Sequence, residues 1–162
     1  MINSTRHYSE WDLCALSGKS NIGVVSITEP DRFVSDLDES KWASVLRLYF
    51  HDIDRKWQNY ALFTIEQADQ IIDWLQEHEE SLEGVYVHCA AGISRSAAVA
   101  KFISDVYGLF FDHRKGALFN RHVYRVLRER IVERGIISVE QLRKHAEEQP
   151  LTRYGAHIKF TE

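Results

Sequence analysis

Apolar residues along the chain follow two patterns, short continuous runs and helical spacing. Runs rich in β-branched, aromatic and aliphatic residues predict buried strands at residues 22–27, 45–50 and 85–88. Apolar residues spaced three and four apart predict helices over residues 64–78, 96–107, 121–134 and 138–147. Strands that alternate with amphipathic helices indicate an α/β fold, with a central, mostly parallel sheet of four or five strands flanked by helices.

Some helices and strands have clear sequence signals at their ends, and others do not. Thr64, with Gln67 three residues later, forms a capping-box pattern at the start of the first long helix. The first strand of the sheet is poorly marked: it is either short and includes Ile2, or it is missing. We expect residues 1–150 to form one domain and residues 151–162 to form a C-terminal tail.

The composition limits the class of protein. Of 162 residues, 44% are hydrophobic and 27% are charged, which suits an ordinary globular domain with a substantial core. The net charge of -4 argues against a nucleic-acid-binding protein, because such domains are basic. Cys14 and Cys89 are the only cysteines, so no disulfide framework is expected. No signal-peptide pattern or membrane-spanning apolar run is present, so we expect a cytoplasmic protein without a membrane partner.

The segment from Val85 to Ser96 carries the most specific chemical signal in the chain. A strand leads to Cys89, a tight loop containing Gly92 follows, and a helix begins near Ser96. Backbone N–H groups in such a loop and at a helix N-terminus bind anions, and Arg95 adds a planar guanidinium that holds two oxygens. The same positive field favours the reactive thiolate of Cys89. The layout predicts a site that holds a tetrahedral oxyanion against a sulfur nucleophile.

Residues 88–96, HCAAGISRS, match the H-C-x5-R-[ST] signature of the protein tyrosine phosphatase superfamily. Over roughly residues 20–135 the chain resembles a compact, bacterial-type member of the dual-specificity branch, which implies a dual-specificity phosphatase-like fold. The resemblance implies that Cys89 forms a phosphocysteine, that Ser96 hydrogen-bonds the thiolate and helps it leave, and that His88 supports the loop. It also implies a phosphate-binding set made of the guanidinium of Arg95 and the backbone N–H groups of Ala90, Ala91, Gly92, Ile93, Ser94 and Arg95.

The resemblance further implies an aspartic acid that protonates the leaving group, on a loop that follows an earlier strand. Asp52 and Asp54 both follow the predicted strand 45–50. Asp52 is the first candidate because it comes just past the carboxyl end of that strand, where ligands bind in parallel sheets. Asp54 is the alternative, and a solvated turn explains either residue as well. Asn120 could also reach the site, although a helix-capping asparagine is the simpler interpretation.

These residues predict a cysteine-dependent protein phosphatase that hydrolyses phosphotyrosine, with phosphoserine and phosphothreonine as further candidate substrates. The expected partner is a phosphorylated protein or another phosphate monoester. No cofactor or metal is expected, because metal-binding histidine and cysteine spacings are absent. Residues 90–94 contain no lysine, whereas members of the resembled family that hydrolyse inositol phospholipids often have lysines there, so the resemblance makes those lipids a poorer prediction. Two alternatives stay open: a phosphate-recognition module without turnover, and a rhodanese-like or arsenate reductase-like enzyme. The oligomeric state is not indicated.

Overall fold

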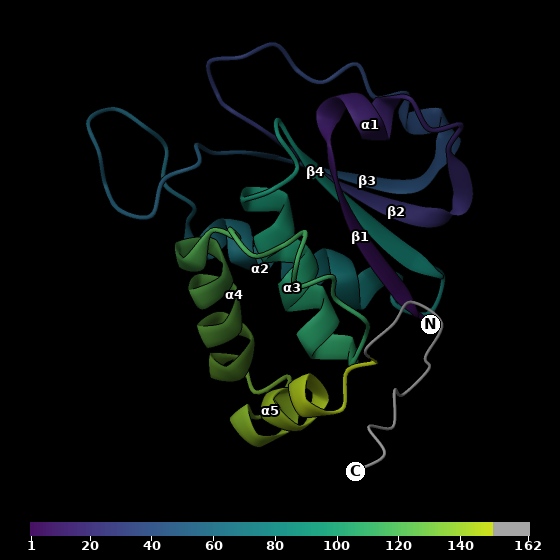
Figure 1. Cartoon of the computed structure of the whole chain (residues 1–162), viewed down its shortest axis with the longest axis vertical. Helices are drawn as coiled ribbons and strands as arrows, with labels where there is room; N and C mark the ends of the chain where they lie inside the picture. Colours follow the sequence, from purple (N-terminus) through teal and green to yellow (C-terminus); the bar gives the residue numbers. More distant parts are fainter. Residues whose placement is uncertain (151–162) are drawn as a thin grey trace.

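The computed structural model describes residues 1–150, and its four strands form one parallel sheet (Figure 1). The strands lie in the spatial order β1-β4-β2-β3, and each neighbouring pair runs in the same direction. Their bounds are β1 (Ser4–Ser9), β2 (Lys19–Thr28), β3 (Trp42–Tyr49) and β4 (Gly84–Cys89). The predicted α/β class and parallel sheet are confirmed. The predicted tail, residues 151–162, lies outside the described residues.

Strand β1 corrects the prediction for the start of the sheet. The strand is neither missing nor built around Ile2, since Ser4–Ser9 pairs with β4 along its whole length. Ile2 lies just before the strand and is buried. The sequence of β1 shows no apolar alternation because the strand lies at the sheet edge, where polar residues are tolerated, and only His7 is fully buried on it.

Helices cover both faces of the sheet. Helices α2 and α3 pack on one face with α4 and α5 beyond them, while α1 lies on the opposite face (Figure 1). Their bounds are α1 (Glu10–Cys14), α2 (Ile65–His78), α3 (Arg95–Tyr107), α4 (Arg121–Glu133) and α5 (Val139–Glu147), with a short 3-10 turn at Glu39–Lys41. Val24 and Val25 on β2 are both fully buried, one in each of two apolar clusters. Successive strand residues point to opposite faces, so both faces of β2 are covered.

The carboxyl ends of all four strands lie at one edge of the sheet, and the connections there hold the candidate residues. Glu29 directly follows β2, Asp52 lies three residues after β3, and Cys89 ends β4. Parallel α/β sheets bind ligands at this edge. Within residues 1–150, none of the helices is long and apolar enough to cross a membrane.

Candidate active site

Cys89 is buried at the end of β4, with 2% of its surface exposed. Its Sγ accepts a hydrogen bond from the Gly92 backbone N–H at 3.3 Å, and the Ser96 hydroxyl oxygen lies 3.2 Å from it. Either atom of the Cys89–Ser96 pair is able to donate when the sulfur is a thiol. When the sulfur is a thiolate, both neighbours donate to it and stabilise its negative charge. Residues 89–96 thus fold around the sulfur.

Alternate carbonyl groups of this loop are turned outward and held by neighbouring elements. Three of them accept hydrogen bonds from outside the loop: Ala90 from the Glu10 N–H at 3.3 Å, Gly92 from the His7 imidazole at 2.7 Å, and Ser94 from the Asn120 N–H at 3.1 Å. The C=O and N–H of a trans peptide point in opposite directions. The N–H groups of Ala91, Ile93 and Arg95 therefore face the inside of the loop, where an oxyanion would accept from them.

Gly92 is required at its position by two separate constraints. Its φ of 74° lies in the left-handed region, which residues with a side chain seldom adopt. A Cβ at this position would also collide with the backbone of Tyr8 and Ser9 at the end of β1. The loop can therefore lie directly against β1 only because residue 92 has no side chain.

Arg95 begins α3 and is buried, with 3% of its surface exposed. Its Nη1 donates to the Phe50 carbonyl at 2.9 Å, and its Nη2 donates to Glu29 Oε1 at 2.6 Å. The buried Nε has no hydrogen-bond partner among residues 1–150. Buried N–H groups are rarely left unpaired, and the helix dipole disfavours a cation at this end of α3. An oxyanion inside the loop would satisfy both conditions.

Glu29 is a functional candidate that the sequence-based set does not contain. Its carboxylate fixes one side of the Arg95 guanidinium, which leaves the Nε side for a ligand. The only signal for Glu29 in the sequence is its position directly after a predicted strand. An acidic residue there is usually a solvated turn residue, so its role follows only from the fold.

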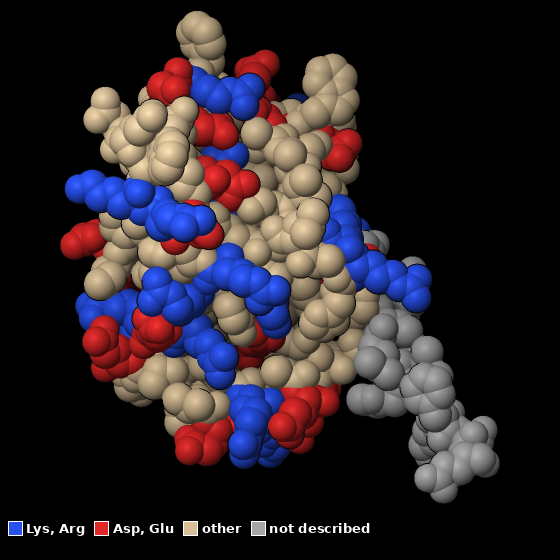
Figure 2. All heavy atoms as spheres, turned by 60° about the vertical axis from the view of Figure 1, so that its left-hand side comes forward, with Lys and Arg blue, Asp and Glu red and all other residues tan. Residues whose placement is uncertain are grey.

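Several cations outside this loop are paired with nearby acids. Figure 2 shows Lys and Arg side chains interspersed with Asp and Glu side chains on the face it presents. Arg130 on α4 bonds Asp69 at 2.8 Å, and Arg134, directly after α4, lies 2.6 Å from Asp73. Asp69 and Asp73 are both on α2. On this face, Figure 2 therefore shows no broad surface of unpaired basic side chains among residues 1–150.

Of the two acid candidates, Asp52 is the one that the fold brings to the loop. Asp52 Oδ1 accepts hydrogen bonds from the Ser94 hydroxyl at 2.7 Å and from Asn120 Nδ2 at 2.8 Å. Asp54 instead lies 3.3 Å from Arg55, and both of those side chains are largely exposed. Because Asp52 receives both bonds on one oxygen, its other oxygen remains open to carry a proton.

Asn120 serves both roles considered for it. Its Oδ1 caps α4 by accepting from the Val123 N–H at 3.1 Å, and its Nδ2 donates to Asp52 and to the Ile53 carbonyl. Its backbone N–H holds the Ser94 carbonyl. One residue therefore connects the start of α4, the loop after β3 and the loop of residues 89–96, and it holds Asp52 and Ser94 close together.

A groove of about 800 Å³ opens beside Asp52 and Ser94. Trp57, Tyr60 and Leu118 line it, and 56%, 45% and 73% of their respective surfaces are exposed. Large apolar side chains are rarely left exposed together unless they contact a partner. The groove therefore offers a contact surface next to the place where the loop would hold an anion.

Comparison with known proteins finds similar chains among solved structures. No protein-family model and no curated protein matches the chain. Among solved structures, three similar ones are Tk-PTP in its active form, PTPMT1 in complex with PI(5)P, and the human tyrosine phosphatase-like serine/threonine/tyrosine-interacting protein. Their identities are 17%, 20% and 20%, and their TM-scores are 0.41, 0.45 and 0.42. The matches cover 91%, 70% and 79% of this chain, and 90%, 78% and 78% of the other chains. At this similarity they carry no argument about chemistry.

His88 lies behind Cys89 and is fully buried. Its Nε2 is 2.7 Å from Ser26 Oγ on β2, and Ser26 Oγ is in turn 3.3 Å from Ser35 Oγ, which accepts from Arg47. Burial lowers the pKa of His88 to about 4, and the charges of Arg47 and Arg95 act in the same direction. The imidazole is therefore neutral at pH 7 and belongs to a buried polar network that joins β4 to β2.

We expect the free energy of unfolding to fall as the pH drops from about 6.5 toward 4. The unfolded chain binds a proton at His88 below about 6.5, whereas the folded protein does so only near pH 4, so acid favours unfolding. Urea unfolding at pH 7 and pH 4.5 measures the difference, of which His88 contributes about 2 kcal/mol. His88→Gln should lose this contribution, and His113→Asn, at an exposed histidine, should keep it. Equal pH dependence in both variants would contradict the assignment.

Proposed function

We propose that this protein is a cysteine-dependent protein phosphatase, with residues 1–150 as a single phosphatase domain. The reaction converts a phosphate monoester and water into an alcohol or phenol and inorganic phosphate. The observation that carries the proposal is the buried Nε of Arg95, which has no hydrogen-bond partner among residues 1–150, beside a loop whose N–H groups face inward around Cys89. Two anchored guanidinium nitrogens and one open nitrogen suit a ligand with several anionic oxygens.

In the first step, the Cys89 thiolate attacks phosphorus. An S–P bond forms while the ester P–O bond breaks, and Asp52 gives its proton to the departing oxygen. The loop N–H groups and Arg95 bind the three non-bridging oxygens, where charge accumulates in the transition state. The hydrogen bonds from Gly92 N–H and Ser96 Oγ to the sulfur support the thiolate that this step requires.

In the second step, water hydrolyses the phosphocysteine. Asp52, now ionised, takes a proton from the water as the new P–O bond forms and the S–P bond breaks. The Ser96 hydroxyl, 3.2 Å from Sγ, donates to the thiolate as it leaves. Phosphate departs, and both Cys89 and Asp52 return to their starting protonation states.

The groove beside the loop supports a phosphorylated protein segment as substrate. Its exposed Trp57 and Leu118 offer apolar surface to the side chain that carries the phosphate, and an aromatic phosphotyrosine ring would bury the most area there. Phosphoserine and phosphothreonine are further candidate substrates, whose smaller side chains would bury less apolar area in the groove. A reactive thiolate needs reducing surroundings, so the proposal also places the enzyme in the cytoplasm.

Phosphate release from p-nitrophenyl phosphate and from a phosphotyrosine peptide, each with and without EDTA, tests the proposal. We expect release from both, with EDTA making no difference. Thiosulfate with cyanide, and arsenate with a thiol reductant, serve as parallel substrates for the rhodanese-like and arsenate reductase-like alternatives. Turnover of either one without phosphate release would overturn the proposal. So would tight binding of the phosphopeptide with no release, which would identify a recognition module.

A further inference from the structure

His7 on β1 contacts the phosphate-binding loop from behind. Its Nδ1 lies 2.7 Å from the carbonyl oxygen of Gly92, and 4% of the residue's surface is exposed. A carbonyl oxygen only accepts hydrogen bonds, so Nδ1 carries the proton and donates. Sequence reasoning does not select His7, because 85 residues separate it from Gly92 and β1 is a poorly marked strand.

The Gly92 carbonyl belongs to the same peptide unit as the Ile93 N–H. In a trans peptide the two groups point in opposite directions, so holding the carbonyl toward β1 turns the Ile93 N–H toward the inside of the loop. The carbonyls of Ala90 and Ser94 are held by backbone N–H groups, whereas Gly92 is held by a side chain. Glycine also tolerates more backbone conformations than other residues. This peptide is therefore the one most dependent on its outside partner.

We propose that His7 is a positioning residue for the oxyanion, acting through the orientation of the Gly92–Ile93 peptide. The proposal deepens the phosphatase function and rests on it. His7 does not touch the reacting atoms. It fixes one of the N–H groups that would bind a non-bridging oxygen of phosphate, and that group contributes most where the oxygen carries the most charge, in the transition state.

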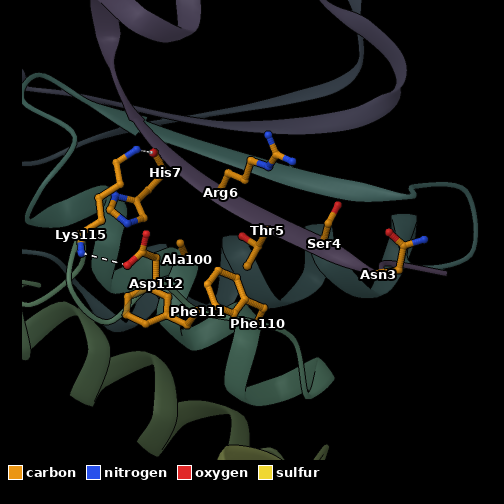
Figure 3. Close-up of a pocket in the computed structure, with 10 residues that line it drawn as sticks. All are labelled: Asn3, Ser4, Thr5, Arg6, His7, Ala100, Phe110, Phe111, Asp112 and Lys115. Carbon is orange, nitrogen blue, oxygen red and sulfur yellow. Dashed lines mark hydrogen bonds between the residues drawn. The ribbon is translucent and has the colours of Figure 1, made fainter. Parts of the chain in front are cut away.

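The environment of His7 holds its ring in place. The ring of Phe111 stacks on the imidazole, with centroids 6.0 Å apart and an interplanar angle of 26°. Lys115 Nζ donates to the His7 carbonyl at 2.9 Å, and the Asp112 side chain bonds the backbone of the Lys115 segment. Figure 3 shows these residues gathered beside β1 around His7. The segment between α3 and α4 thus supports the imidazole that supports the loop.

Three substitutions at His7 distinguish the effect of its hydrogen bond to Gly92 from the effect of its ring shape. His7→Phe keeps a ring against Phe111 but has no donor. His7→Asn places an amide N–H at the position of Nδ1, one bond beyond Cγ, and can still reach the Gly92 carbonyl. His7→Gln carries its amide one bond further along and is displaced from that carbonyl. We therefore expect phosphatase activity to be highest in wild type, lower in His7→Asn, and lowest in His7→Gln and His7→Phe.

Steady-state kinetics on p-nitrophenyl phosphate should show kcat about tenfold lower in His7→Phe, with KM changed by less than about threefold. His7→Asn should recover most of kcat. Inhibition by vanadate, which resembles the transition state, should weaken more than inhibition by phosphate. If His7→Phe does not fold, as judged by thermal unfolding, the comparison of His7→Asn with His7→Gln decides. Equal kcat in wild type and His7→Phe, or in His7→Asn and His7→Gln, would overturn the proposal.

An anion-binding readout keeps this inference distinguishable from the proposed function. In the ¹⁵N-labelled full chain, titration with inorganic phosphate should shift the Ile93 amide resonance in wild type and much less in His7→Phe. The Arg95 amide, whose peptide is held by Asn120, serves as the internal control and should shift in both. If wild type releases no phosphate but shows this pattern, the phosphatase proposal fails while the positioning role stands. If phosphate shifts the Ile93 amide resonance as much in His7→Phe as in wild type, the positioning role is contradicted and the phosphatase proposal is not affected.

Discussion

Cys89→Ser is expected to lower phosphate release from p-nitrophenyl phosphate at least about 1,000-fold. A serine hydroxyl is a far weaker nucleophile than a thiolate at neutral pH. The described groups that hydrogen-bond the Cys89 sulfur, the Gly92 N–H and the Ser96 hydroxyl, are not bases that would activate it. The substitution removes little volume from the buried site, and the Gly92 N–H and the Ser96 hydroxyl can still bond an oxygen at this position. The loss should therefore appear in kcat, measured by initial rates.

Two controls make this result specific. Cys14→Ser should leave turnover unchanged, because Cys14 is exposed and its thiol is unsuited to act as a thiolate. Partial desolvation of the thiol and the carboxylates of Glu10 and Asp36 raise the pKa of Cys14. Inorganic phosphate should still bind Cys89→Ser within a few-fold of wild type, since Arg95 and the loop N–H groups remain. Full activity in Cys89→Ser would show that the nucleophile lies elsewhere.

Local patterns in the chain were sufficient to predict most of the fold. The capping box at Thr64 is present, with Gln67 N–H to Thr64 Oγ1 at 3.2 Å and the return bond at 3.1 Å. Gly108, with a φ of 65°, ends α3. The buried strands β2 and β4 read as apolar runs because helices cover both of their faces. Caps, stops and buried runs each depend on a few adjacent residues, so a single sequence contains them.

The features that the sequence could not show depend on contacts between distant segments. β1 was misplaced because an edge strand of polar residues has no apolar period. Glu29 has only its position after a strand as a local signal, and His7 has none. What makes them important is the Arg95 guanidinium 66 residues away and the Gly92 carbonyl 85 residues away. Asn120 was interpreted as a cap, and it is one. Its bond to Asp52 appears only once α4 lies beside the loop after β3.

Asp52→Asn should lower kcat on a phosphotyrosine peptide about 100- to 1,000-fold, while Asp54→Asn should change it less than about threefold. The amide in Asp52→Asn can still accept from Ser94 and Asn120, so the loop keeps its geometry while the transferable proton is lost. Asp54→Asn is the matched control, because the ion pair that Asp54 makes within residues 1–150 is with exposed Arg55. Initial-rate kinetics on the purified variants measure both effects.

Two further readouts identify Asp52 as the acid rather than as a structural residue. With p-nitrophenyl phosphate, whose leaving group departs readily as an anion, the loss in Asp52→Asn should be much smaller than with the peptide, because less proton transfer is needed. A structural defect would lower both rates equally. The fall in kcat at alkaline pH, caused by ionisation of the acid, should flatten in Asp52→Asn and persist in Asp54→Asn. A large loss of kcat in Asp54→Asn with little change in Asp52→Asn would make Asp54 the acid. Small, equal losses of kcat in both variants would mean that another group donates the proton.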